Sequence, residues 1–353
     1  MTSEQWILTW RFNATGRGLI HVKALNLQFK IVMKRNSRVI KMLTLFISLW
    51  AAFSSCIFEG ERECPDMQAV TVKSDWSMAP GSDPEGMAYL FFPDDGTEVW
   101  RFDFPGRDAG RVSLRTGRYQ FLSFNDDTYS VLFRGDRRYD TYEAYTADKE
   151  VPVSTGEKCV ATPDMMWGCA SDGLILGYDG LRYNPTPSAE AEDKWILSSD
   201  FILTAKQRRI TSRYRYRIEE VENLDGVKSM SGALTGMAGS VLLASGARGD
   251  YPSTLAVKAA AADSTTIAGE FFTFGIPQVP AADNILNLYV VLKDGRHFCY
   301  RFDVTEQVRG ASDPLDVMLT VSGLKLEQSE GSEGTGFDVN VDGWEIVIVN
   351  IKG

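Results

Sequence analysis

Histidine is almost absent from this chain of 353 residues, which carries only His21 and His297. A Ser-His-Asp triad would have to use His297, and no G-x-S-x-G turn accompanies it. The five cysteines form no C-x-x-C pair, which argues against a redox site or a zinc ribbon. These absences favour a protein that works without catalytic residues, a metal or another cofactor.

A run long enough to span a membrane is also missing, because the apolar stretch Met42–Phe53 is shorter than the about 20 residues that such a helix needs. A basic stretch, 34–41, precedes it, and Ser54-Ser55-Cys56 follows it. This order is typical of a secretory signal that ends in a lipobox. We therefore expect 33–55 to be a lipoprotein signal peptide and Cys56 to carry the lipid. Two or three acyl chains, at about 0.8 kcal/mol per buried CH2, make a stable anchor.

Residues 1–32 do not fit this pattern, since a signal begins near its basic region and Met33 is a natural start. We interpret them as a misassigned start or a removed extension. Residues 56–67 contain four acidic side chains and are expected to form an acidic tether between the lipid and the folded body.

Basic residues are outnumbered, because 37 Lys and Arg against 47 Asp and Glu give a net charge of −10. Residues 1–55 carry 8 of the basic residues and 1 of the acidic ones, so the rest of the chain has a net charge of −17. Binding to phosphate backbones needs a basic footprint. The balance argues against nucleic acid as a partner and suits a body held off an anionic membrane surface.

Many short runs alternate apolar and polar residues with period two, as half-buried strands do. Val70–Trp76 is one, and Met87–Phe92 and Glu98–Phe104 flank Pro93-Asp-Asp-Gly96, a turn typical of a hairpin. Asp294-Gly295 predicts another hairpin, and the runs 110–114 and 118–124 are expected to pair around Thr116-Gly117. The other expected strands are 110–114, 118–124, 131–133, 141–145, 195–204, 210–218, 240–244, 254–259, 266–274, 285–292, 297–304, 316–321 and 344–351. The pattern predicts an all-β fold of antiparallel β-sandwiches, with one helical turn at 304–308.

Residues 184–194 are rich in Pro, Ser and acidic side chains, which is typical of a linker. We expect an N-terminal β-sandwich at 68–183 and a C-terminal one at 195–353. Export to an oxidising compartment would permit disulfides. Cys64, Cys159, Cys169 and Cys299 allow three pairings that the sequence does not resolve, and a bond between Cys159 and Cys169 is the favoured one.

Two strands are candidate partner-binding sites. Arg213, Arg215 and Arg217 share one side of a predicted strand. They form either a solvated face paired with neighbouring acids or a site for an acidic partner, since guanidinium groups match carboxylate and sulfate. The terminal strand 344–351, with Trp344, Ile346 and Ile348, either completes its own sheet or joins a partner's sheet by strand addition.

Two further features have a structural and a chemical interpretation. Asp126-Asp127 forms either an Asx-type loop or, less favourably, a pair for glycoside hydrolysis or calcium binding. His297, Cys299 and Arg301 alternate with an aromatic face, so His297 is expected at the surface rather than in a metal pair.

Several longer motifs are spread through residues 56–353. They are Asp75-Trp-Ser-Met-Ala-Pro80 with Pro84-Glu-Gly-Met87, Arg101-Phe-Asp-Phe104 with Gly106-Arg-Asp-Ala-Gly110, Phe124-Asn-Asp-Asp-Thr128, Leu132-Phe-Arg-Gly135, Thr162-Pro-Asp-Met-Met-Trp167, Ser231-Gly-Ala-Leu-Thr-Gly-Met237, Phe272-Thr-Phe-Gly275, Leu288-Tyr-Val-Val-Leu-Lys-Asp-Gly295 and Gly336-Phe-Asp-Val-Asn-Val-Asp-Gly-Trp344. In these motifs the chain resembles an uncharacterised-domain family of Bacteroides-group surface lipoproteins. That family is similar in layout to the fimbrillin superfamily, the subunits and anchors of type V pili.

The resemblance implies two tandem β-sandwiches with transthyretin-like topology and no enzymatic role. Stalk subunits of such pili lose an N-terminal strand by cleavage after an Arg, whereas anchors keep their lipid. Arg101 and Arg107 lie in or beside expected strands, so no clear cleavage site is seen in an exposed loop between the first two strands. This favours an anchor or accessory lipoprotein over a stalk subunit. The resemblance also makes the acidic residues after Cys56 similar to a signal for export to the outer surface.

The expected function is therefore that of a lipid-anchored protein of the outer membrane, exposed at the cell surface, that binds other surface or pilus proteins. It would act as a fimbrial anchor or accessory subunit, or as an adhesin. The alternative is a glycan-binding or glycan-processing lipoprotein of a polysaccharide-uptake system, which would need exposed aromatic side chains along a groove with two carboxylates nearby.

Overall fold

The computed structural model describes residues 67–153, 156, 158–183, 196–278, 282–329 and 343–349. The predicted signal peptide 33–55, Cys56, Cys64, nearly all of the tether and the linker 184–194 lie outside the described residues. Within the described ranges, no helix is long and apolar enough to cross a membrane.

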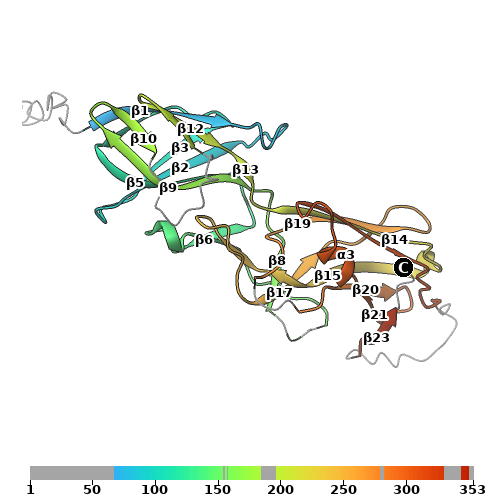
Figure 1. Cartoon of the computed structure of the whole chain (residues 1–353). Coiled ribbons are helices and arrows are strands. Elements are labelled where there is room, and N and C mark those ends of the chain that lie inside the picture. The colour runs from blue at the N-terminus through green and yellow to red at the C-terminus, as the bar shows by residue number, and fades with distance from the viewer. Residues whose placement is uncertain are drawn as a thin grey trace, which may run out of the picture. The chain divides into compact units, whose positions relative to one another are not determined.

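The described chain is nearly all β, as the sequence predicts, and its strands form two sandwiches and one small sheet (Figure 1). Alternation of buried and exposed residues explains why the strands form: in β4 (Arg111–Arg115), Val112 and Leu114 are buried while their neighbours are exposed. Most neighbouring strands are antiparallel, and four pairs are parallel: β1 with β12, β14 with β22, β17 with β8 and β21 with β23.

The first sandwich packs sheet A on sheet B. Sheet A has the order β11 (Ile196–Ser199), β12 (Ile202–Lys206), β1 (Met67–Asp75) and β4. Sheet B has the order β10 (Gly180–Tyr183), β9 (Trp167–Gly177), β5 (Gly117–Asn125), β2 (Gly86–Pro93) and β3 (Trp100–Pro105), and β13 (Arg208–Arg209) also pairs with β9. The core between them includes Val70 and Leu203 from sheet A and Phe91 and Phe121 from sheet B.

The second sandwich packs sheet D on sheet E. Sheet D has the order β23 (Glu345–Val349), β21 (His297–Asp303), β20 (Ile285–Leu292), β15 (Val227–Ala238), β17 (Pro252–Val257) and β8 (Lys158–Ala161). Sheet E has the order β18 (Ala260–Ala261), β19 (Ile267–Thr273), β14 (Ser212–Glu219) and β22 (Asp316–Ser322). Tyr214 and Tyr216 of sheet E and Phe302 of sheet D are among the side chains buried between the two sheets.

Sheet C is formed by β16 (Ser240–Leu242), β7 (Glu143–Thr146) and β6 (Val131–Arg134). It covers the face of sheet B that points away from the first core, through a cluster that includes Leu90, Phe124, Val131 and Val241. The helical elements of the described residues are η2 (Tyr139–Thr141), η3 (Leu224–Gly226) and α3 (Thr305–Arg309), and α3 matches the single turn expected near 304–308.

Two of the three expected strand pairs are present; the runs 110–114 and 118–124 do not pair, because β4 pairs with β1 in sheet A and β5 with β2 and β9 in sheet B. Antiparallel β2 and β3 flank Gly96 at φ 73°, and antiparallel β20 and β21 flank Gly295 at φ 91°. Positive φ is a conformation that glycine adopts without a steric penalty, which is why these two turns were readable from sequence.

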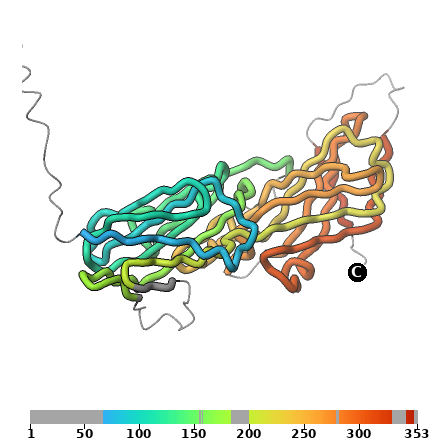
Figure 2. The backbone as a smooth tube through the Cα atoms, turned by 90° about the horizontal axis from the view of Figure 1, so that it is seen from above, coloured from blue at the N-terminus to red at the C-terminus, as the bar shows by residue number. Residues whose placement is uncertain are grey.

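The strands do not divide between the sandwiches at 184–194. β12, which follows that segment, lies parallel to β1 in the first sandwich (Figure 2), whereas β8, which precedes it, joins β17 in the second. Parallel neighbours need a crossover connection, so they cannot be inferred from adjacent runs. Leu203 is fully buried in the first core, which explains where β12 packs.

Candidate interaction surface

The terminal strand β23 forms one edge of sheet D. It runs parallel to β21, with Cys299 opposite Ile346 and Arg301 opposite Ile348. Val347 and Val349 pack against the core of the second sandwich. The alternate side chains point outward, and Ile346 is 50% and Ile348 74% exposed. The strand therefore presents apolar side chains to solvent on one face only.

A small aromatic cluster fixes the start of β23 on the outer face of sheet D. The Trp344 ring stacks on His297, with centroids 5.0 Å apart, and meets Tyr289 edge-on at 5.6 Å. His297 is half-buried, with the Trp344 ring stacked on it. Stacking of this kind contributes about 0.5–1.5 kcal/mol beyond area burial.

Cys299 and Tyr289 lie beneath this cluster, together with Val151 and Val153 from the segment before β8. The Tyr289 hydroxyl donates to the Val153 carbonyl at 3.3 Å. Burial raises the pKa of the Cys299 thiol to about 11 and also raises the pKa of Tyr289. Both groups are therefore neutral at physiological pH, and this part of the outer face is apolar.

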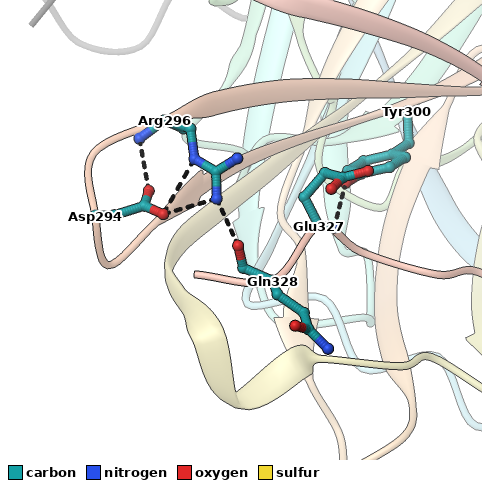
Figure 3. Close-up of polar contacts among 5 residues, drawn as sticks. All are labelled: Asp294, Arg296, Tyr300, Glu327 and Gln328. Carbon is teal, nitrogen blue, oxygen red and sulfur yellow. Dashed lines mark hydrogen bonds and ion pairs between the residues drawn. The ribbon is translucent and has the colours of Figure 1, made fainter. Parts of the chain in front are cut away.

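The chain is fastened to the β20–β21 hairpin before it reaches β23. The closing segment, Leu324–Gln328, follows β22 and ends at this hairpin (Figure 3). The Arg296 guanidinium donates to the Asp294 carboxylate, at 2.9 Å from Nη2, and to the Gln328 carbonyl. The same guanidinium lies 5.6 Å from the centre of the Phe298 ring.

The closing segment is also held from the core side. The Tyr300 hydroxyl accepts a hydrogen bond from the Glu327 N–H at 3.1 Å (Figure 3), and Leu324 and Leu326 are buried in the core of the second sandwich. These contacts seal the end of the sandwich beside β21.

Edge strands expose backbone groups that can pair with another chain. Within the described ranges β23 ends the sheet, so no strand there pairs with its outer edge. An apolar face beside an open edge suits strand addition, in which main-chain bonds give affinity and alternate side chains give specificity. Trp344, Ile346 and Ile348 lie together on this face, as their alternation in the sequence predicts, whereas no sequence signal indicates the contacts of Tyr289 or the 151–153 segment.

The arginine row on β14 carries its own counter-ions. Arg213 pairs with Glu270 at 2.7 Å, Arg215 with Asp316 at 2.8 Å and Arg217 with Glu219 at 3.0 Å. The hydrogen bond to Glu270 raises the pKa of Arg213. The row lies on the outer face of sheet E and thus apart from the β23 face of sheet D.

The favoured disulfide is not formed. Cys159 lies on β8 of sheet D and Cys169 on β9 of sheet B, and no disulfide joins them. The two strands belong to different sandwiches.

Asp127 lies in a loop, but the hydrogen bonds of its carboxylate are not the local backbone bonds of the Asx interpretation. Its carboxylate accepts from the Glu85 N–H at 2.8 Å and from the Asn125 side chain at 2.7 Å. Burial, with Asp103 nearby, raises the pKa of Asp126. In the ranges that the structure describes, no group of three or more His, Cys, Asp or Glu side chains is placed to hold a metal ion.

The sequence model of a family described as "Domain of unknown function (DUF5119)" matches residues 62–258, more than half of the chain. The chain belongs to this family. The matched region contains the whole described first sandwich and ends just after β17 of the second.

A fimbrium anchoring subunit of Bacteroides ovatus, Fim4B, is 25% identical over 173 residues, which are 49% of this chain and 46% of that protein. The chain thus spans about half the length of this curated relative. The crystal structure of a Bacteroides ovatus protein described as an adhesin is 19% identical, covers 74% of this chain and 93% of its own, and has a TM-score of 0.54, which shows a shared fold. The fimbrial anchor protein Mfa2 of Porphyromonas gingivalis is 13% identical, with 72% and 89% covered and a TM-score of 0.43.

Proposed function

We propose that this protein is a lipid-anchored component of the bacterial outer surface that acts as a fimbrial anchor or accessory subunit, or as an adhesin, by binding other surface or pilus proteins. The match of nearly half the chain to a protein named as a fimbrium anchoring subunit carries the proposal. The signal-like residues 33–55 and Cys56 supply the route to the surface and the lipid site.

The exposed face of β23 supplies a means of binding. A partner strand alongside β23 would gain main-chain hydrogen bonds, and its side chains would cover Ile346 and Ile348. Burying apolar surface contributes roughly 25 cal/mol per Å². Such a site needs no charged partner, which fits a chain whose arginine row is already paired.

The lipid part of the proposal is tested by mass spectrometry of the N-terminus of protein purified from the native membrane. The expected species begins at Cys56 and carries two or three acyl chains. A protein that begins elsewhere without lipid would remove the anchor from the proposal.

The binding part is tested by crosslinking in intact cells followed by affinity purification. The double variant Ile346→Asp/Ile348→Asp is compared with Met318→Asp, which changes a residue 42% exposed on sheet E. The unmodified chain and Met318→Asp should capture the same β-rich surface protein, and the double variant should lose it. Equal capture by all three would remove β23 as the binding site, and capture of no surface protein by any of them would remove the function.

A further inference from the structure

The second sandwich has four edge strands among the described residues: β23 and β8 in sheet D, and β18 and β22 in sheet E. An unpaired edge can accept a strand from another chain, and proteins protect such edges by keeping them short, charged or covered. β18 has two residues and offers an added strand little to pair with. The other three edges differ in what lies against their backbone groups.

The outer edge of β8 is covered by the segment that precedes it. The Lys149 N–H donates to the Cys159 carbonyl at 3.0 Å, and the Ala161 N–H donates to the Ala147 carbonyl at 2.9 Å. These bonds place 147–149 antiparallel to β8. This edge therefore already has a backbone partner from the same chain.

On β22, every second residue turns its backbone groups away from sheet E. The carbonyl of Leu315 and the N–H of Gly323, which flank β22, bond to the region of β14, so the odd-numbered residues between them face that strand. The N–H and C=O groups of Met318, Thr320 and Ser322 consequently point to the open side. The side chains of these three residues are exposed and uncharged, so charge does not protect this edge.

The side chain of Gln307 occupies the middle of the β22 edge. Its Nε2 donates to the Thr320 carbonyl at 2.9 Å, and its Oε1 accepts from the Thr320 N–H at 2.8 Å. In an antiparallel sheet, two paired residues exchange these same two bonds through their backbones. The Gln307 amide thus takes the place that an added strand would need.

The fold holds Gln307 in this position. The residue lies on α3, between β21 and β22, and Val304 and Val308 beside it are buried in the core of the second sandwich. The Thr305 N–H donates to the Asp303 carboxylate at 3.0 Å, which fixes the start of the helix. The amide is therefore presented to β22 by a helix that the core anchors.

β23 lacks a cover of either kind among the described residues, where its one paired neighbour is β21. We propose that Gln307 is a specificity-determining residue, whose amide closes β22 to strand addition and leaves β23 as the edge of this sandwich that pairs with a partner. The use of β23 rests on the proposed function, whereas the closure of β22 is tested separately. Without Gln307, β22 pairs with β22 of a second copy, because two such uncharged strands are complementary to each other.

Self-association of the full chain, purified in detergent and measured by light scattering after size exclusion, tests the closure. Every chain compared carries Ile346→Asp and Ile348→Asp, which oppose association through β23. Gln307→Ala should self-associate at least tenfold more tightly than the parent that keeps Gln307. Gln307→Glu is the matched control, because it also loses the amide donor but places a charge at the edge, and it should associate no more than the parent. Equal association of the alanine and glutamate variants, or of all three chains, would overturn the proposal.

Hydrogen exchange of the backbone amides shows where the copies meet. The Thr320 amide should be protected in the parent at every protein concentration. In Gln307→Ala it should exchange at least tenfold faster in dilute solution and regain protection, together with Met318 and Ser322, as the concentration rises. Association without renewed protection of β22, or unchanged exchange at Thr320, would overturn the closure. Neither measurement involves the surface partner, so a failure here is distinct from a failure of the proposed function.

Discussion

The two six-stranded sheets differ in what covers their outer faces. On sheet B, Leu90, Leu122 and Phe124 are buried under sheet C, which the same chain supplies. On sheet D, among the described residues, Tyr289 and Cys299 are covered by Trp344 and the 151–153 segment, and further along β23 Ile346 and Ile348 are exposed. The chain completes the first face by itself and leaves apolar surface on the second, which is where a partner would add to it.

The largest effect that this comparison predicts is at Phe124. Its ring is fully buried, 4.8 Å from Phe133 and 5.5 Å from Tyr142, centre to centre. Phe124→Ala should lower the free energy of unfolding by about 3–5 kcal/mol, because the cover of sheet B cannot close over the cavity. Chemical denaturation measures this, and Phe124→Leu should cost under about 1.5 kcal/mol. A loss below about 1 kcal/mol for the alanine variant would mean that sheet C is not a structural cover.

Trp344→Ala makes the corresponding change on sheet D. The ring is half-buried and packs on His297 and Tyr289, so its loss should lower the free energy of unfolding by about 1–3 kcal/mol, less than at Phe124. Ile348→Ala, at a residue 74% exposed, is the matched control and should change it by under about 0.5 kcal/mol. If both alanine variants lowered the free energy of unfolding equally, the outer faces of sheets B and D would both be packed cores, and the contrast between them would be wrong.

Alkylation of the cysteines also tests how well Trp344 covers the outer face of sheet D. The thiolate is the reactive form, and burial raises the pKa of Cys299 to about 11 and also raises that of Cys159. Because pH 8 lies well below the raised pKa of Cys299, only about a thousandth of this thiol is ionised at that pH. Iodoacetamide at pH 8, followed by peptide mass mapping, should label half-buried Cys159 at least tenfold faster than Cys299. Trp344→Ala should speed labelling of Cys299; unchanged labelling would show that Trp344 does not cover it.

The sequence was sufficient to predict strands that have one polar face and turns that have a characteristic sequence. In β21, Phe298, Tyr300 and Phe302 are buried as the alternation predicts, and the Asp-Gly turns define both hairpins. The arginine row likewise alternates with buried Tyr214 and Tyr216. In these places the local alternation of apolar and polar residues is enough to predict which side chains are buried in the folded protein.

The sequence was insufficient for β9 and β15, which have neighbours on both sides and are rich in small residues. Glycines interrupt the period of two in both strands. At Gly168 a Cβ would collide with the Ser123 carbonyl oxygen, and Gly236, at φ 71°, lies where the pairing of β15 with β17 shifts register. Small residues there allow close backbone approach, which a hydrophobicity pattern does not record. The cavity lined by Arg208, Arg209 and Arg248 escaped notice for a related reason: its residues come from four separate segments.

The smallest expected effects separate the two candidate surfaces. Arg215→Met removes a partly exposed ion pair with Asp316, and such pairs contribute about 0–1 kcal/mol, so the free energy of unfolding should fall by no more than that. Ile348→Asp replaces an exposed side chain at the sheet edge and should change it by under about 0.5 kcal/mol. With folding nearly unchanged in both, crosslinking in cells reports on binding alone. Loss of the partner in Ile348→Asp and not in Arg215→Met would assign binding to the uncovered face of sheet D. Loss of the partner in Arg215→Met and not in Ile348→Asp would instead assign binding to the arginine row on sheet E. Acidic groups of the partner would then replace the acids that pair with these arginines.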